Sequence, residues 1–373
     1  MKLVVSGGHL TPALALIEYI NLKHPQDQIT FVGRLYNKAG KKQTSQEKAE
    51  VKKLGARFIS FESSKLKTTS LFNKIVSIPK ICTATIKAMS IFITIKPDVF
   101  ISFGGYLALP LAIASYILRI PIITHEQTRS AGVANILISK IASKIAISYP
   151  ESLEYFPKSR THLTGNLIRN SILQKNTTLP SWIKKKPLKP ILYITGGSQG
   201  SEIINQTVSE VLKPLLKNWF VIHQCGKPVG NRNYRKELER VQLKLSLANQ
   251  SAYKIREWVS ESELSWIYSN CTGMISRAGA NTTEEIALKG IPAILIPLPF
   301  SHNDEQHKNA VALSDKKQAI LLEQKNLNPE VLIEATEVLK KYNRKFSRNL
   351  QLFSKAKNSQ QKLYKLAQSV VKK

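Results

Sequence analysis

The chain has 373 residues, 43% of them hydrophobic, which is enough for two or three packed domains. Its formal net charge is +30, from 55 Lys and Arg residues against 25 Asp and Glu residues. Such an excess favours an anionic partner: nucleic acid, an acidic membrane surface or a phosphorylated substrate. An organism whose proteins are all basic would produce the same excess without any such partner.

The cysteines and the apolar runs exclude several classes of protein. Cys82, Cys225 and Cys271 are odd in number and widely spaced, which argues against a disulfide framework or a zinc site and for a reducing compartment. The first residues read as a strand that runs into a glycine turn, so we expect no signal peptide. No apolar run reaches the roughly 20 residues that span a membrane. We expect a protein that is soluble or peripheral on a membrane.

The first part of the chain alternates strands and helices, which is typical of a parallel, doubly wound sheet. A glycine turn at 6–9 follows the first strand, and Pro12 suits the first turn of the next helix. A second glycine turn occupies 103–106. We predict strands at 2–5, 29–32, 58–61, 99–102, 122–124 and 144–147.

The pattern breaks and then restarts. Residues 166–190 include a run rich in Lys and Pro, so we predict a linker between a first domain, 1–165, and a second domain, 191–335. The second domain again opens with a strand and a glycine turn, at 196–200. We predict its strands at 191–195, 220–223, 253–255, 273–275 and 293–296. The expected fold is α/β, with two Rossmann-like domains of parallel sheet.

Two segments combine apolar and basic side chains. Residues 336–373 predict a basic amphipathic helical segment, with apolar positions at Val338, Tyr342, Phe346, Leu350 and Phe353. Its basic face is either solvated or turned toward a membrane. Residues 71–96 interleave Leu, Phe and Ile with Lys, which predicts core packing for most side chains and leaves open a membrane-facing patch ringed by Lys.

The stretch 275–297 reads as a strand, a turn of small residues, a helix and a further strand. The unpaired N–H groups at such a helix N-terminus attract phosphate. We expect Thr282 and Thr283 to cap this helix, and Glu285 to accept hydrogen bonds from sugar hydroxyls beside the phosphate. The alternative is an ordinary turn with a solvated glutamate.

Four glycine turns begin near residues 6, 103, 196 and 277. Ligands of open parallel sheets bind outside the carboxyl ends of the strands, so we expect two domains facing a cleft that joins phosphorylated or sugar substrates. His9 follows the first turn at a helix N-terminus, where the dipole favours a neutral imidazole that can act as general base. Its alternative role is a hydrogen bond to a loop.

We expect neither a metal ion nor another cofactor. The four aspartates are far apart in sequence, so the chain has no D-x-D pair for a divalent cation; they are Asp27, Asp98, Asp304 and Asp315. A leaving diphosphate would instead be stabilised by helix N-termini together with Ser198, Arg169 and Arg277.

Seven segments carry a family resemblance. They are S-G-G-H-L-T-P-A at 6–13, K-P-D-V-F-I-S-F-G-G-Y at 96–106, H-E-Q at 125–127, G-N-L-I-R at 165–169, G-G-S-Q-G at 196–200, R-A-G-A-N-T-T-E-E at 277–285 and P-F-S-H-N-D-E-Q-H-K-N-A at 299–310. In this order they resemble the MurG family, the UDP-N-acetylglucosamine:lipid I N-acetylglucosaminyltransferases of peptidoglycan synthesis. Members have a GT-B fold of two Rossmann-like domains.

The resemblance implies a division of labour. The first domain would hold lipid I and the second UDP-N-acetylglucosamine, with Glu285 on the ribose, the backbone of Val259 on the uracil and Gln306 on the sugar. His9 would be the general base and Glu126 a second catalytic group. The other implied substrate-binding residues are Ser6, Gly7, Gly8, Thr128, Arg169, Ser198, Arg277, Gly279, Ala280, Asn281, Thr282, Thr283 and Glu284.

The implied reaction is an inverting transfer to the 4-hydroxyl of the acceptor, on the cytoplasmic face of the cell membrane. The implied partners are both substrates and an anionic membrane surface, without nucleic acid. One alternative is another UDP-sugar:lipid glycosyltransferase, for example one that acts on diacylglycerol. The other is a non-catalytic basic protein that binds nucleic acid or anionic lipid.

Overall fold

A computed structural model describes residues 1–35, 46–63, 71–174, 176–197, 199–228, 232–341 and 358–371. For Gln46, residues 71–78 and His302 it describes the backbone alone. The expected diphosphate ligand Ser198 lies outside the described residues, as do four of the five apolar positions predicted for the C-terminal segment, from Tyr342 to Phe353.

The chain forms two compact units, each described here by itself. The first comprises Met1–Asn170 together with Lys355–Lys373, and the second comprises Ser171–Ser354. The expected linker 166–190 is thus divided between the units, and the expected C-terminal segment 336–373 contributes a helix to each.

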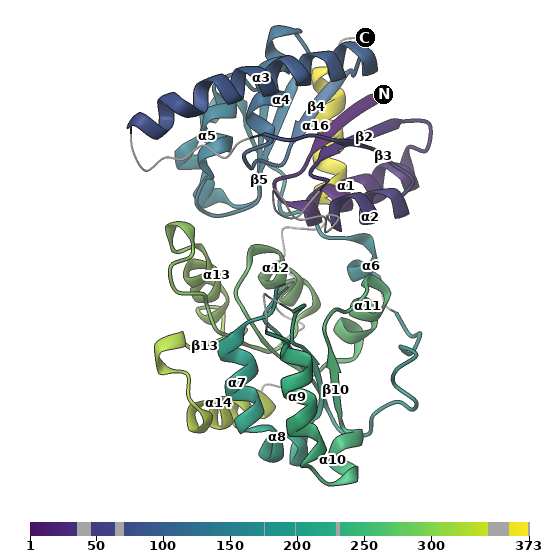
Figure 1. Ribbon diagram of the computed structural model, residues 1–373, viewed down its shortest axis with the longest axis vertical. Helices are drawn as coiled ribbons and strands as arrows, with labels where there is room; N and C mark the ends of the chain where they lie inside the picture. The colour runs from purple at the N-terminus through teal and green to yellow at the C-terminus, as the bar shows by residue number, and fades with distance from the viewer. Residues whose placement is uncertain are drawn as a thin grey trace. The chain divides into compact units, whose positions relative to one another are not determined.

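The described part of the first unit contains a seven-stranded parallel sheet in the order β3-β2-β1-β4-β5-β6-β7 (Figure 1). Its strands are β1 (Lys2–Ser6), β2 (Gln28–Gly33), β3 (Arg57–Ser60), β4 (Val99–Ser102), β5 (Ile122–Glu126), β6 (Lys144–Ile147) and β7 (Thr161–Leu163). Its helices and 3₁₀ turns are α1 (Leu10–Lys23), α2 (Gln46–Lys53), α3 (Leu71–Ile95), α4 (Ala108–Ile117), α5 (Val133–Ser139), η1 (Pro150–Tyr155), η2 (Lys158–Arg160) and α16 (Ser359–Val370), and α6 (Asn170–Leu173) begins at its boundary.

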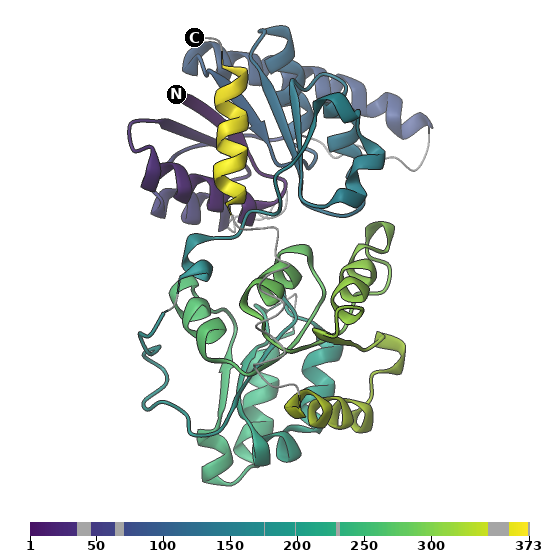
Figure 2. The ribbon, with the colours of Figure 1, turned by 180° about the vertical axis from the view of Figure 1, so that it is seen from behind.

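Both faces of this sheet are buried, as continuous apolar strands predict. Alternation along β1 places Leu3 and Val5 in the core under α1, while Val4 packs in the other core with side chains of α3 and α4. The C-terminal helix α16, drawn in yellow, lies on the α1 side of the sheet (Figure 2). Leu363 and Ala367 of α16 are fully buried in the α1 core.

The described part of the second unit contains a six-stranded parallel sheet in the order β10-β9-β8-β11-β12-β13. Its strands are β8 (Ile191–Thr195), β9 (Phe220–Gln224), β10 (Tyr253–Arg256), β11 (Gly273–Ser276), β12 (Ala293–Leu295) and β13 (Ala319–Leu321). Its helices and 3₁₀ turns are α7 (Glu202–Glu210), α8 (Leu212–Asn218), α9 (Tyr234–Leu243), α10 (Leu247–Ser251), α11 (Glu261–Asn270), α12 (Ala280–Lys289), η3 (His302–Asp304), α13 (Glu305–Ser314), η4 (Gln324–Asn326) and α14 (Pro329–Lys341).

Each of the eleven predicted strands is confirmed, with its ends within about two residues. Two strands were missed, β7 and β13, and each has three residues. Both lie at an edge of their sheets. Such short strands are defined by pairing with a neighbour, here β6 and β12, and strand preference depends on that context more than on the residues alone.

All four glycine turns lie where the strand order of a sheet reverses. In the first unit they follow the neighbouring strands β1 and β4, and in the second they follow β8 and β11. Helices from these two strands leave on opposite faces of the sheet, which opens a crevice at the carboxyl ends. The fold therefore places each pair of turns at a ligand-binding position of its own sheet.

The described part of the segment from Ser171 to Pro190 packs within the second unit. Ile172 and Ile183 are almost fully buried, and the indole Nε1 of Trp182 donates to the carboxylate of Glu263. Asn176 donates through its side chain to the carbonyl of Ser262. Within the described ranges, no helix has the length and apolar character needed to cross a membrane.

Candidate active site

The two glycine turns of the first unit touch each other. A methyl group added to Gly8 would lie 2.4 Å from the carbonyl oxygen of Gly104, and one added to Gly105 would lie 2.6 Å from the Cα of Gly8. Gly104 and Gly105 also have φ values of 72° and 76°, which favour glycine. Close contact between the two backbone segments is therefore built into this end of the sheet.

His9 is the residue that immediately precedes α1, in extended conformation, and its side chain reaches solvent. The pKa of its imidazole lies below the usual value, because the surrounding protein desolvates the ring; the charge of Glu126 acts in the opposite direction. The helix N-terminus also disfavours the imidazolium. A neutral, accessible imidazole is the form that can accept a proton.

Glu126 ends β5, and only 2% of its surface is exposed. Its Oε1 accepts hydrogen bonds from the backbone N–H (3.0 Å) and hydroxyl (2.6 Å) of Thr128. Its Oε2 accepts from the Gly132 N–H and the Asn135 side chain, both at 2.8 Å. Three N–H donors, together with a Thr128 hydroxyl that is shared with the Ser130 carbonyl oxygen, hold the carboxylate in place, and its charge acts on His9.

His125, which precedes Glu126, was not singled out from the sequence. Its ring is buried against Phe103, with 5.3 Å between ring centroids, and its Nε2 lies 3.3 Å from the carbonyl oxygen of Gly165. Burial lowers its pKa to about 4, so the ring is neutral and Nε2 carries the proton. The H-E-Q segment was the available signal, but only the fold shows that all three of its residues are buried.

Other predicted residues of the first unit lie at the ends of its strands or in the loops that follow them. Ser6 ends β1 and is fully buried, and Gly7 packs against the ring of Phe31. Arg169 lies just before α6 and is half-buried. The structure thus brings His9, Glu126, Thr128 and the turn 6–8 together at the carboxyl edge of one sheet.

The second unit has a cavity of about 650 Å³ at the carboxyl ends of β8 and β11. Four residues expected from the sequence line it: Arg277, Gly279, Thr282 and Gln306. The cavity wall also contains residues that were not on the expected list, namely Gly196, Gly197, Gln199, Gly200, Ser201, Glu202, Ile203, Gln206, Ser276, Leu298 and Gln324.

Arg277 is held in a fixed position at this cavity. Its Nη1 donates to the carbonyl oxygens of Ile296 and Pro297 at 3.1 and 3.2 Å, and its Nη2 donates to the Ser201 hydroxyl at 2.8 Å. Burial lowers the pKa of the guanidinium, although an arginine remains charged in proteins. A preoriented cation suits an anionic ligand such as a diphosphate.

The predicted caps of α12 are wrong. The helix begins at Ala280 with Gly279 as its N-cap, so Thr282 and Thr283 lie inside the first turn. The Thr283 hydroxyl donates back to the carbonyls of Gly279 (3.0 Å) and Ala280 (3.1 Å). The N-cap of α12 makes no side-chain hydrogen bond, and a helix N-terminus attracts an anionic ligand. Asn281 and Glu284 are half-buried on the same turns.

Glu285 is not a solvated glutamate. Only 7% of its surface is exposed, and its Oε2 accepts a hydrogen bond from the hydroxyl of Tyr268 at 2.9 Å. Burial and this carboxylate raise the pKa of Tyr268 well above its usual value, so Tyr268 remains a donor. Glu285 lies one turn into α12, behind the cavity lining formed by Gly279 and Thr282.

Gln306 lines the cavity of the second unit, whereas Val259 does not. Gln306 is the second residue of α13, and its Oε1 accepts from the Leu298 N–H at 3.0 Å. Val259 is buried just before Ser260, the N-cap of α11. Neither Val259 nor Glu285 lines the cavity itself.

The glycine loop after β8 is in close contact with the loop after β9, a contact that the sequence did not suggest. A methyl group on Gly200 would lie 2.1 Å from the Cys225 carbonyl oxygen, and one on Gly226 would lie 2.5 Å from the Gln199 carbonyl oxygen. The loops after β8 and β9 are therefore pressed together, in parallel with the contact between Gly8 and Gly104 in the first unit.

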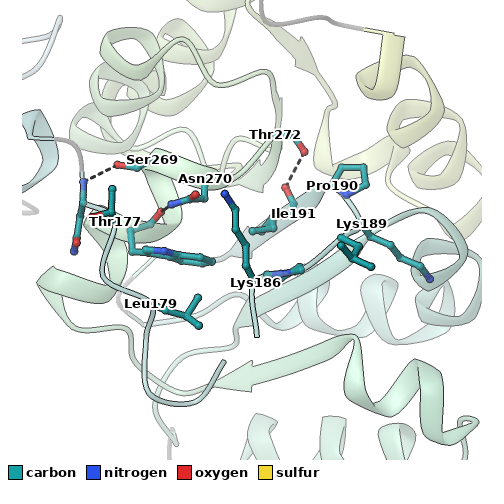
Figure 3. A pocket seen from close by; sticks show the side chains of 13 residues that line it. Thr177, Leu179, Lys186, Lys189, Pro190, Ile191, Ser269, Asn270 and Thr272 are labelled. Carbon is teal, nitrogen blue, oxygen red and sulfur yellow. Dashed lines mark hydrogen bonds between the residues drawn. The ribbon is translucent and has the colours of Figure 1, made fainter. Parts of the chain in front are cut away.

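A second cavity, of about 450 Å³, is formed by residues 176–191 and the end of α11 (Figure 3). Lys186, Asn270 and Trp266 line it, and it holds none of the described residues expected to bind substrate. Among the described residues, no group of three or more His, Cys, Asp or Glu side chains is arranged to hold a metal ion.

Two family models match the chain. The N-terminal domain of glycosyltransferase family 28 matches residues 5–147, and the C-terminal domain of the same family matches residues 191–370. The matches begin within the first strand of each unit.

Curated relatives match over most of the chain. The UDP-N-acetylglucosamine–N-acetylmuramyl-(pentapeptide) pyrophosphoryl-undecaprenol N-acetylglucosamine transferase of Clostridium perfringens is 31% identical over 349 residues, covering 93% of this chain and 91% of the relative. The protein of that name from Caldanaerobacter subterraneus is 34% identical over 337 residues, covering 90% and 88%.

Solved structures share the fold. The crystal structure of Acinetobacter baumannii MurG aligns over 99% of both chains, with a TM-score of 0.70 and 24% sequence identity. The fold, the two family models and the relatives together identify this chain as a member of the MurG family within glycosyltransferase family 28.

Proposed function

We propose that the protein transfers N-acetylglucosamine from UDP-N-acetylglucosamine to the 4-hydroxyl of the N-acetylmuramoyl group of lipid I. The observation that carries this proposal is the cavity of the second unit, where a preoriented arginine and an uncapped helix N-terminus adjoin uncharged amide side chains. The first two suit a diphosphate, and the amides suit a sugar. The relatives named above carry this activity in their names.

The donor is assigned to the second unit. The diphosphate binds at the N-terminus of α12 and at Arg277, beside the loop that contains Ser198. The ribose hydroxyls bind the Glu285 carboxylate, and the backbone at Val259 contacts the uracil. Gln306 binds the sugar. The buried position of Glu285 supports this role, because a carboxylate that accepts a hydrogen bond from Tyr268 keeps its orientation.

The acceptor is assigned to the first unit, where His9 acts as general base. The acceptor 4-hydroxyl oxygen attacks the anomeric carbon as the bond from that carbon to the diphosphate breaks. His9 takes the hydroxyl proton, UDP departs, and the anomeric configuration inverts. Glu126 stabilises the imidazolium that forms, as its effect on the pKa of His9 requires.

No step of this proposal needs a metal ion. Charge that develops on the departing diphosphate is stabilised by Arg277 and by the N–H groups of α12. Arg169 belongs to the first unit and is proposed to contact the donor.

The protein is further proposed to act peripherally at the cytoplasmic face of the cell membrane, where lipid I is embedded. Helices α3 and α4 pack against each other, yet they expose Ile86, Ile93, Tyr116 and Ile117, with Ile86 67% and Ile93 57% exposed. Lys80, Lys87, Lys96 and Arg119 on or next to the same helices are exposed as well. Exposed isoleucines flanked by cations suit an anionic bilayer.

Calorimetric titration with UDP-N-acetylglucosamine, UDP-glucose and UDP-galactose tests the donor. Preferential binding of UDP-N-acetylglucosamine is expected, followed by formation of lipid II when lipid I is added. Preference for another UDP-sugar would replace this function with a different lipid glycosyltransferase. A protein that binds none of the three would contradict the donor assignment.

A further inference from the structure

We infer that Gln324 is a further specificity-determining residue of the donor cavity, and that its side-chain amide hydrogen-bonds to the transferred sugar. The inference rests on the proposed function and deepens it. Gln324 was not among the residues expected from the sequence, and it lines the same cavity as Arg277 and Gln306.

The side chain has an unmet hydrogen-bonding requirement. The Oε1 of Gln324 is buried and has no hydrogen-bond partner within the described part of the protein. A buried, unpaired amide oxygen is destabilising, and native proteins rarely retain one without a reason. The last torsion of a glutamine is soft, so the amide can turn toward a ligand that offers a donor.

The backbone that carries Gln324 is firmly placed at the cavity. β13 pairs with β12, and the Leu322 N–H continues the ladder by donating to the Leu295 carbonyl at 2.9 Å. The turn η4 is closed by the Leu327 N–H, which donates to the carbonyl of Gln324 at 3.2 Å. The loop after β13 therefore lies beside the loop after β12, which carries Leu298.

A contact between their neighbours holds Gln324 and Gln306 on the same wall. Glu323 Oε1 lies 3.4 Å from the Nε2 of His307, which follows Gln306 on α13. Gln306 has its Oε1 engaged by the Leu298 N–H, so its amide offers mainly N–H donors to a ligand. Gln324 has the complementary free oxygen.

The composition of the wall decides which part of the donor binds there. Gln199, Gln206, Gln306 and Gln324 all line the cavity. The one carboxylate in the lining, Glu202, is paired with Arg232. Uncharged amides near Gln324 match hydroxyl and amide groups of a sugar, whereas the diphosphate is better matched at Arg277 and the N-terminus of α12.

The test compares the affinity for UDP-N-acetylglucosamine with the affinity for UDP, by calorimetry, in the full-length wild type and in Gln324→Ala and Gln324→Leu. Loss of one neutral hydrogen bond is expected to weaken binding of UDP-N-acetylglucosamine by about 2- to 12-fold. The UDP affinity should stay at the wild-type value, because UDP has no sugar to bind.

The matched control is Asn326→Ala, since Asn326 belongs to the same turn, is exposed and lies outside the cavity lining. It should leave both affinities unchanged. Thermal unfolding of the ligand-free Gln324→Leu protein provides a second readout. Its melting temperature should equal or exceed that of the wild type, because the substitution removes an unpaired buried oxygen.

Three results would overturn the assignment. The first is wild-type affinity for UDP-N-acetylglucosamine in both variants. The second is an equal loss of affinity for UDP and for the sugar nucleotide, which would place Gln324 on the nucleotide or in the fold. The third is a wild-type protein that binds neither ligand, and that result alone would remove the proposed function as well.

Discussion

At the scale of single residues, the environments of two glutamates separate two roles that the sequence could not distinguish. Glu126 is held by three N–H donors and by a hydroxyl that it shares with the Ser130 carbonyl oxygen, and Glu285 is fixed by one tyrosine hydroxyl among its contacts. Both were expected at the site. The first is suited to act through its charge and the second as a hydrogen-bond acceptor held in a fixed orientation.

His9→Ala should reduce turnover by about 10²–10⁴-fold if His9 is the general base, with UDP-N-acetylglucosamine affinity unchanged. Steady-state kinetics with a soluble lipid I analogue measures this effect. An unchanged rate would leave His9 a residue of the loop only.

Glu126→Gln provides a test of the electrostatic role. In the wild type, the turnover rate should fall on acidification, as His9 becomes protonated. Because desolvation lowers the pKa of His9, this fall should lie below the usual histidine pKa of about 6.5. The charge of Glu126 raises the pKa of His9, so removing that charge should move the fall in turnover rate to still lower pH. A fall in turnover rate that stays at the wild-type pH or moves to higher pH would contradict the electrostatic role of Glu126.

Glu285→Ala should weaken binding of both UDP and UDP-N-acetylglucosamine by about 1.5–3 kcal/mol for each hydrogen bond lost to the charged acceptor. Tyr268→Phe is the matched variant, because it removes the buried partner and keeps the carboxylate, so it should have the smaller effect. Wild-type UDP affinity in Glu285→Ala would exclude Glu285 from the ribose site.

At the scale of elements, the strand-turn-helix unit of β11 and α12 was predicted correctly, except for the residue at which the helix begins. The glycine turn, the helix and the following strand all form. The helix starts at Ala280, however, and the expected threonine caps are internal. Since Thr283 bonds back to the carbonyls of its own helix, its presence near a turn was an ambiguous signal.

Gly279→Ala should separate ligand approach from folding. A methyl group there would meet no described atom within 4 Å beyond its chain neighbours, and φ is −66°, so thermal stability should not change. If the diphosphate approaches the N-terminus of α12, the methyl group should weaken UDP binding about tenfold or more, through loss of a charge-assisted hydrogen bond. Unchanged UDP affinity would place the diphosphate elsewhere.

The docking of α16 can be measured in the same way. Leu363 is fully buried in the core that α16 shares with α1, so Leu363→Ala should destabilise the first unit by about 2–5 kcal/mol. Lys362→Ala, at an exposed position of the same helix, is the control. Urea unfolding should resolve the difference, and equal stability of the two variants would show that α16 adds little to the unit.

At the scale of the whole molecule, the net charge of +30 bears on membrane binding where cationic side chains lie beside exposed apolar side chains. Ile86→Glu combined with Ile93→Glu should weaken binding to phosphatidylglycerol vesicles about tenfold or more, since each buried isoleucine contributes about 1.5–3 kcal/mol. UDP affinity should remain unchanged. Vesicle co-sedimentation at fixed ionic strength measures the loss.

Leu247→Glu is the matched control for this pair, because Leu247 is an exposed apolar residue of the second unit. It adds the same kind of charge away from α3. If it weakens vesicle binding as much as the α3 substitutions, the binding reflects net charge and the apolar surface is not the docking site.

Local features of the sequence were sufficient for much of this architecture. Short apolar runs, glycine turns and helix-terminating residues act within a few positions of the chain, so eleven strands and all four turns could be placed from sequence alone. The order of segments was also sufficient to indicate the family. The edge strands β7 and β13 escaped, because pairing with a distant strand defines them.

Burial and partner choice depended on the tertiary structure, because they are set by segments that are far apart in sequence. Only the fold shows that Tyr268 meets Glu285, that Gly8 presses on Gly104, and that α16 returns to the first unit. Gln324 has no motif around it. Its importance follows from a cavity wall assembled by the loops after β8, β11, β12 and β13, which no local pattern encodes.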